Sequence, residues 1–398
     1  MAETVIGVND DLAVQVWGKR LYVEALKKTL IMKFCGEGPD NVVQVRDELS
    51  SGAGAKVTYG LRMQLKGQGV SGDATLQGKE EELVRYSDSL IIDQLRHAVK
   101  VVGNMSQQRV PWSIRAEAES GLADWWAGRM DTSLFNQLAG NIAQNGGSGD
   151  PEPYNYTGMQ AATAPTIVTN NTRHLFADQY AADGSFNVPG ISETAIGTYV
   201  VAGAGRAAPF RLELIDRAVV LARTSSPAIR PIVMNGMECY VLFLHPHQVL
   251  QLRQNSTAGQ WLDIQKAAMT GGLVTKNPVF TGALGMYNNV ILHEAVRVPF
   301  GDDTQLGLNT NSDLGPAAAG TTNIARAVFC GAQSGAIAFG RANGWSGTNV
   351  RFKWTEVLDD YENQIGVSAA LVWGMNKTTF NGSDFGSIVI STVSPGIA

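Results

Sequence analysis

The sequence predicts an α+β fold. Three observations lead to this prediction: an alternating strand that runs into a glycine-rich turn, one long helix soon after it, and strand patterns near both ends of the chain. Strands that lie far apart in a sequence can still pair, so we expect the two ends of the chain to meet in one sheet.

The first predicted element is a β-hairpin that begins at Lys56. Every second residue after Lys56 is apolar, which is typical of a half-buried strand. These apolar positions are Val57, Tyr59, Leu61, Met63 and Leu65, and the glycines of the predicted turn are Gly67, Gly69, Gly72 and Gly78. The return limb, about residues 83–102, fits a strand or a helix, and we favour a strand in its first half.

This hairpin has no obvious partner nearby in the sequence. An arm of about ten residues would reach about 33 Å, and an isolated two-stranded ribbon is marginal in water. We therefore expect a neighbouring copy of the chain to cover its apolar face. The feature favours an assembly protein over an enzyme.

A helix is predicted over residues 111–141. Pro111 suits the first turn of a helix, and a helix of this span would be about 45 Å long. Gly121 and Gly128 each weaken it by about 1 kcal/mol, so we expect them to admit another backbone at close range. Its apolar face consists of Ile114, Ala118, Leu122, Trp125, Met130, Leu134 and Leu138.

Further elements follow from the same patterns. A helix is expected over 16–33, and residues 145–165 read as a loop or insertion within an irregular stretch that continues to about residue 208. Later helices are expected over 209–223, from 246 through 254, and over 260–269. Strands are expected over 239–244, 290–298, 325–330, 351–357, 364–375 and 387–392. The turn DDYEN joins the strand over 351–357 to the strand over 364–375.

Composition limits the classes of function. A chain of 398 residues has room for two or three domains, and 44% apolar content is ordinary for a globular protein. The net charge of −5 argues against a basic face that wraps nucleic acid, although a mildly acidic wall can still enclose DNA. The three cysteines read as reduced thiols of a cytosolic product. We see no secretory signal and no apolar run long enough for a membrane helix.

Motifs for chemistry are weak. GQGVSG at Gly67–Gly72 matches a dinucleotide fingerprint, but the strand before it alternates with polar residues, so a hairpin tip is the better interpretation. His245 and His247 could form a metal site together with His293 on another strand, yet an i, i+2 pair such as His245 and His247 at a strand end is more typical of capping or surface histidines. We predict no catalytic, cofactor-binding or metal-binding residue.

Two other groups have structural interpretations. The acidic residues around Asp359 fit a solvated turn better than paired catalytic carboxylates. Most tryptophans, including Trp125 and Trp126, fit a core or an interface better than a ligand box. An isopeptide bond from Lys66 or Lys79 to an asparagine such as Asn363 or Asn376 would need a buried lysine, which an exposed tip does not provide.

Three segments resemble the major capsid proteins of tailed bacteriophages, in the group typified by N-four-like podoviruses. The most specific is TLQGKEEELVRYSDSLIIDQLRHAVKVVGNMSQQRVPWSIRAEAESGLADWW, residues 75–126. The segments GALGMYNNVILHEAVRVP (282–299) and DYENQIGVSAALVWGMNKTTFNGSDFGSIVI (360–390) support it in combination. They fall in the family's order over most of the chain, and 145–208 offers the least to match.

The resemblance implies the shell fold of tailed phages and herpesviruses, often called the Johnson fold. It implies an N-terminal arm (1–52), an extended loop hairpin (53–102), a peripheral domain with the spine helix 111–141 and an irregular insertion (103–208), an axial domain (209–330), and C-terminal strands of the peripheral domain (331–398). The hairpin residues named above would form the subunit interface, and Trp125 and Trp126 would mark the spine helix.

The implied function is self-assembly into hexamers and pentamers that form an icosahedral shell around packaged double-stranded DNA, without sequence-specific binding. A separate scaffolding protein, a portal and a decoration protein are the expected partners. The expected location is the virion capsid, assembled in the host cytoplasm. Two alternatives remain: an encapsulin-like compartment for protein cargo, and a soluble nucleotide-dependent enzyme that uses GQGVSG.

Overall fold

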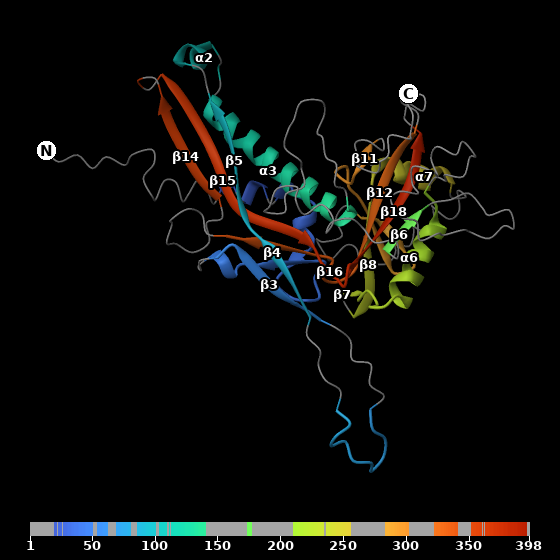
Figure 1. Cartoon of the computed structure of the whole chain (residues 1–398). Helices are drawn as coiled ribbons and strands as arrows, with labels where there is room; N and C mark the ends of the chain where they lie inside the picture. Colours follow the sequence, from blue (N-terminus) through green and yellow to red (C-terminus); the bar gives the residue numbers. More distant parts are fainter. Residues whose placement is uncertain are drawn as a thin grey trace, which may run out of the picture.

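The structure of the chain is a computed structural model. The described residues are 20–21, 23–25, 27–50, 54–62, 69–80, 86–100, 103–109, 111, 113–140, 173–176, 210–234, 236–255, 283–301, 322–340, 352–359, 361 and 363–395. Two main sheets, one helix that runs between them and a projecting hairpin make up this part of the protein (Figure 1).

The first sheet has six strands and joins both ends of the chain. Its order is β1-β2-β13-β15-β14, and β5 also pairs with β15. The expectation that the chain ends meet in one sheet is therefore confirmed. The strands are β1 (Cys35–Gly36), β2 (Val43–Arg46), β5 (Asp93–Lys100), β13 (Gly335–Phe339), β14 (Phe352–Asp359) and β15 (Gln364–Lys377).

The second sheet has eight strands, in the order β6-β18-β12-β8-β10-β9, with β11 on β12 and β7 on β8. Helices α6 (Leu212–Thr224) and α7 (Pro246–Asn255) belong to the same part of the molecule, and the apolar face of α6 packs into its core. The strands are β6 (His174–Phe176), β7 (Ile232–Met234), β8 (Met237–Leu244), β9 (Ala283–Tyr287), β10 (Val290–Glu294), β11 (Phe300–Gly301), β12 (Thr322–Cys330) and β18 (Ser387–Pro395).

The last strand separates from the other C-terminal strands. β18 pairs along its whole length with β12 of the eight-stranded sheet, whereas β14 and β15 lie in the six-stranded sheet. The range 331–398 is thus divided between the two sheets. The domain boundaries that the resemblance to capsid proteins implies stay a prediction.

The long helix is α3 (Ile114–Ala139), which has 26 residues and so is about 39 Å long. Ser113 caps it, because its side chain accepts from the Ala116 amide, and Gly140 ends it in the left-handed conformation. The predicted start at Pro111 is wrong: Pro111 precedes the cap and lies outside the helix.

Helix α3 connects the cores of the two sheets. Trp126 packs edge-on against Phe352 of β14, and Phe135 packs against Phe243 of β8. One core cluster accordingly contains residues of α3 and of both sheets. The expectation that two glycines of α3 admit another backbone is not met at Gly128, whose nearest described atoms belong to a side chain, and it stays a prediction at Gly121. Gly121 is exposed with no described atom beside it, and Gly128 faces the side chain of Arg297.

The remaining elements agree with the sequence patterns in kind and differ at their ends. The described residues between 20 and 28 are helical, and a 3-10 helix, η1 (Ile31–Phe34), follows in place of the expected last helical turn. Strand β10 ends at Glu294, four residues before the predicted end, because the chain turns at 296–298. The expected loop at 145–165 and helix at 260–269 lie outside the described residues.

Short elements complete the described chain: η2 (Glu48–Ser50), α2 (Asn104–Arg109), β16 (Thr379–Phe380) and β17 (Ser383–Asp384). Cys35, Cys239 and Cys330 are free thiols. Among the described residues, no helix combines the length and the apolar character needed to cross a bilayer.

Candidate assembly site

The hairpin is formed by β3 (Lys56–Leu61) and β4 (Tyr86–Ile91), which pair antiparallel with Lys56 opposite Ile91 and Leu61 opposite Tyr86. Beyond this pair, residues 69–80 lie far from the two sheets (Figure 1). The return limb continues past Ile91 as strand β5, which pairs with β15 instead of the outgoing arm. The strand prediction is confirmed, but the hairpin is shorter than residues 53–102.

The root of the hairpin, β3 with β4, is covered by its own chain. Val57, Tyr59 and Leu61 are only 3%, 2% and 4% exposed. They form a small core with Leu90, Ala336, Ala338 and Phe385. The prediction that a neighbouring copy covers these three side chains is wrong, because β13 presents two alanines that leave room for them. Met63, Leu65 and Gly67 lie outside the described residues.

The tip of the hairpin, residues 69–80, is exposed at every position except the half-buried Val70. Gly69, Gly72 and Gly78 have positive φ, which L side chains rarely adopt. No described atom lies within 4 Å of where a Cβ would stand at any of the three. Leu76 is 57% exposed. Within the described part of the chain, no other segment packs against these three glycines of the tip.

Polar contacts fix the root as well. The Tyr59 hydroxyl donates to Asp88 at 3.3 Å and lies 3.3 Å from the Thr378 hydroxyl, while the Thr379 amide donates to Asp88 at 2.9 Å. Burial, with help from the Asp88 charge, raises the pKa of Tyr59, so the phenol remains a neutral donor. These bonds join the hairpin to the segment that follows β15.

Close backbone packing holds the other side of the root. A Cβ at Gly374 of β15 would overlap the carbonyl oxygen of Ile91. A Cβ at Gly340 would lie 2.7 Å from the Ile92 side chain. Gly374 needs glycine because the obstacle is backbone, whereas the atoms near Gly340 belong to side chains. The chain therefore leaves the hairpin by crossing β15 at contact distance at Gly374.

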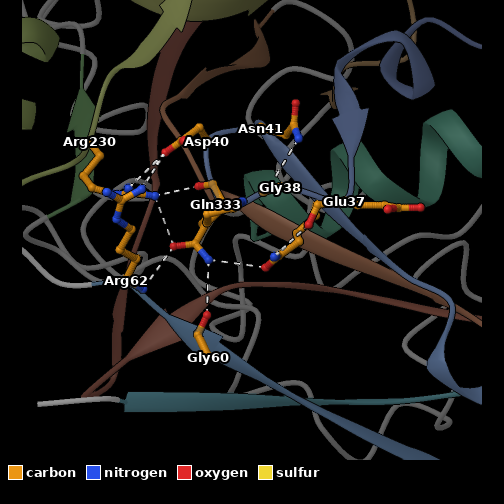
Figure 2. Close-up of polar contacts among 10 residues, drawn as sticks. Glu37, Gly38, Asp40, Asn41, Gly60, Arg62, Arg230 and Gln333 are labelled. Carbon is orange, nitrogen blue, oxygen red and sulfur yellow. Dashed lines mark hydrogen bonds and ion pairs between the residues drawn. The ribbon is translucent and has the colours of Figure 1, made fainter. Parts of the chain in front are cut away.

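A surface network surrounds the point where β3 ends (Figure 2). Arg62 and Arg230 both donate to the same Asp40 oxygen, at 3.3 and 3.2 Å, and Arg230 also donates to the Pro39 carbonyl at 2.6 Å. Desolvation lowers the pKa of Arg230, while Asp40 acts in the opposite direction. The sequence patterns missed these residues, because they come from three distant segments and share no local motif.

Trp125 and Trp126 both lie on α3. Trp126 is fully buried in the main core, whereas Trp125 is half-buried and stacks on His97 of β5 with ring centroids 4.2 Å apart. Burial lowers the pKa of His97. Trp126 therefore serves the core, and Trp125 retains a partly open face.

The candidate chemical residues do not converge. His245 and His247 stack on Phe300, whereas His293 packs with Phe34 and Phe243 in the main core. Burial lowers the pKa of both His245 and His293 to about 4, so both are neutral at pH 7. No group of three or more potential metal ligands occurs among the described residues.

Most described residues of the other motifs are exposed. Gly69 and Gly72 lie in the exposed tip, and the described residues 69–80 contain no helix for a dinucleotide. Lys79 is exposed, unlike the buried lysine that an isopeptide bond requires, and Lys66 lies outside the described residues. Tyr361, in the turn between β14 and β15, is fully exposed.

Comparison with known proteins decides the family. A family model described as phage capsid protein matches residues 5–396, nearly the whole chain. The chain belongs to the phage capsid protein family. The major capsid protein of Pseudomonas phage KPP25 is 27% identical over 382 residues, which cover 94% of this chain and 93% of that protein.

Solved structures agree on the fold. The capsid of Ralstonia phage GP4 aligns with a TM-score of 0.72 and 29% identity over 100% of both chains. The capsid of cyanophage Pam1 aligns with a TM-score of 0.62 and 19% identity over 94% of each chain. The fold is that of tailed-phage capsids, and the predicted resemblance is confirmed. This capsid protein is a structural component of the phage virion.

Proposed function

We propose that this major capsid protein tiles its shell as hexamers and pentamers, and that the hairpin tip makes the decisive contact with a neighbouring subunit. The observation that carries the proposal is the contrast within the hairpin: a buried root and a tip that is almost wholly exposed. A projecting element with a firm base is suited to reach another copy of the chain.

Three features of the tip support this role. Leu76 offers an apolar side chain, the three glycines permit the positive φ angles of the turns, and Lys79 and Glu80 supply charges of both signs. Stable protein interfaces bury about 1,200–2,000 Å² in total. The tip is too small to supply this area alone, so it would act together with broader contacts of the two sheets.

The net charge of the chain is compatible with a shell that contains DNA. A net charge of −5 suits a wall that surrounds double-stranded DNA without gripping it. We further propose separate scaffolding and portal proteins, a decoration protein, and assembly in the host cytoplasm. No enzymatic activity is proposed, because the alternative of a nucleotide-dependent enzyme rests on the GQGVSG match alone.

A compartment for protein cargo is the remaining alternative. The family match and the curated relative are phage capsid proteins, which favours a DNA-containing shell. Recombinant shells alone would not separate the two functions, so the particles must be purified from infected cells. Nucleic acid in these particles supports the phage capsid, and an enclosed enzyme contradicts it.

The role of the tip is tested by deleting residues 67–78. We expect a soluble, folded subunit that sediments as a small species and fails to make shells. Normal shells from the deletion would contradict the role given to the tip.

A finer version compares two exposed side chains of similar accessibility. Leu76→Ser changes the tip, and Val220→Ser changes the outer face of α6, where Val220 is 60% exposed. Shell yield, measured by sedimentation and electron microscopy, should fall for Leu76→Ser and remain normal for Val220→Ser. Equal yields would show that the tip has no special part in assembly.

A further inference from the structure

One buried side chain, that of Gln333, is bonded to the hairpin and to both sheets (Figure 2). Its amide oxygen accepts from the Arg62 backbone N–H at 3.2 Å and from the Arg230 guanidinium at 3.3 Å. Its amide nitrogen donates to the Gly60 carbonyl at 3.2 Å and to the Gln44 side chain at 3.3 Å. All four hydrogen-bonding positions of the amide are therefore used.

These partners come from distinct parts of the fold. Gly60 and Arg62 lie at the end of β3, and Gln44 lies on β2 of the six-stranded sheet. Arg230 lies two residues before β7, which pairs with β8 of the eight-stranded sheet. The Gln333 backbone N–H also donates to Asn41, just before β2, at 2.8 Å.

Gln333 occupies the connection between the two sheets. Residues 331–334 link β12 of the eight-stranded sheet to β13 of the six-stranded sheet. Gln333 has φ of +55°, a conformation that costs a non-glycine residue about 1–2 kcal/mol. Such strain persists only where surrounding bonds impose it.

The connection itself is tightly packed. The Ala332 amide donates to the Arg230 carbonyl and the Gly331 amide donates to the Gly386 carbonyl, both at 2.8 Å. Gly386 immediately precedes β18, so the two passages of the chain between the sheets lie side by side. A Cβ at Gly386 would lie 2.7 Å from the Ala332 carbonyl oxygen, which leaves no room for sliding.

We propose that Gln333 is a coupling residue that makes the direction of the hairpin depend on the angle between the two sheets. A change in that angle must move residues 331–334 relative to Arg230 or to Gln44. Because the Gln333 amide is 1% exposed, water cannot replace a broken bond, and an unpaired buried amide costs about 1–3 kcal/mol. The hairpin base therefore follows the connection as one unit.

Distance measurement on the full-length unassembled subunit tests the coupling. Spin labels at Thr58→Cys, an exposed position of β3, and Val233→Cys, an exposed position of β7, report the hairpin against the eight-stranded sheet. The background is Cys35→Ser, since Cys239 and Cys330 are buried and burial raises the pKa of both thiols. We expect one narrow distance population.

The variant Gln333→Gly keeps the unusual φ without strain and removes the amide. We expect loss of the single population and about tenfold faster amide exchange over residues 60–62. The matched control is Gln248→Ala. Gln248 is a fully buried glutamine whose side-chain amide bonds to His245, Ala325 and Thr392, far from the hairpin in the chain. The Gln248→Ala variant should be less stable than the wild type and should keep the single narrow distance population between the spin labels.

A second variant, Arg230→Met, retains Gln333 and removes the bonds of the Arg230 guanidinium to Gln333, Asp40 and the Pro39 carbonyl. It tests the same link to the eight-stranded sheet if Gln333→Gly does not fold. An unchanged distance population in the folded variants would overturn the coupling. The coupling lies within one subunit, so this result would leave the proposed role of the tip in shell assembly untouched.

Discussion

The root and the tip of the hairpin belong to one continuous ribbon but are held by different means. At the root, Val57, Tyr59 and Leu61 lie in a small core, and Asp88 receives bonds from two segments. At the tip, three glycines have positive φ with open space around them. The root thus contributes to the stability of one subunit, while the tip adds little to that stability and is available to another subunit.

The largest expected effect comes from blocking the crossing of the hairpin over β15. Gly374→Ala should lower the free energy of unfolding by about 4 kcal/mol, because its Cβ would overlap the Ile91 carbonyl and backbone cannot easily move aside. Urea denaturation measures the loss. Gly366→Ala, on the same strand, meets its nearest neighbour at 3.6 Å and should be nearly neutral. Equal effects would mean that the crossing does not fix the root.

Truncating one leucine in each region gives the next effect. Leu61→Ala should cost about 3 kcal/mol, because it empties a buried site. Leu76→Ala should cost less than about 0.5 kcal/mol in the subunit, because Leu76 is exposed. Stability and shell yield are measured for both variants. A large loss of subunit stability from Leu76→Ala would remove the contrast between root and tip.

A third effect concerns Asp131 of α3, a buried carboxylate that accepts from the Leu30 and Ile31 amides at 2.9 and 3.2 Å. Burial raises its pKa from 3.8 to about 6 against the opposing effect of these bonds and of Arg297 and Lys33. A raised pKa in the folded state contributes stability that is full below about pH 4 and is lost as pH rises through about 6. The contribution is on the order of 3 kcal/mol, because one pKa unit corresponds to about 1.4 kcal/mol.

Asp131→Asn tests this sign. The difference in unfolding free energy between wild type and variant should favour wild type most near pH 4 and shrink by pH 7. Asp124→Asn is the control on the same helix, where an exposed carboxylate pairs with Lys28. Exposed ion pairs contribute about 0–1 kcal/mol. A difference that grows with rising pH would contradict the burial argument.

The smallest effect is expected at the tip glycines. Gly72→Ala should cost about 1 kcal/mol, because φ of +66° is unfavourable for alanine although space is open. Thermal unfolding should detect little change, whereas shell yield should respond if the path of the tip is part of the contact. An unaffected shell yield would restrict the contact to side chains such as Leu76.

Sequence patterns identified much of the fold. Alternation placed Val57, Tyr59 and Leu61 on one apolar face, and the helical pattern located α3 to within three residues at each end. The β14–β15 pair was predicted with its turn. These features depend on residues close together in the chain, which is why a single sequence reveals them.

By itself, then, the sequence determined which faces are apolar, where the long helix runs and where glycines allow turns. Only the tertiary structure decided what covers the hairpin root, because Ala336 and Ala338 lie nearly 280 residues away and their small size matters only once β13 is beside β3. The Gln333 network is of the same kind. A periodic pattern shows that a face must be buried, but the partner that buries it is chosen by the packing of distant segments.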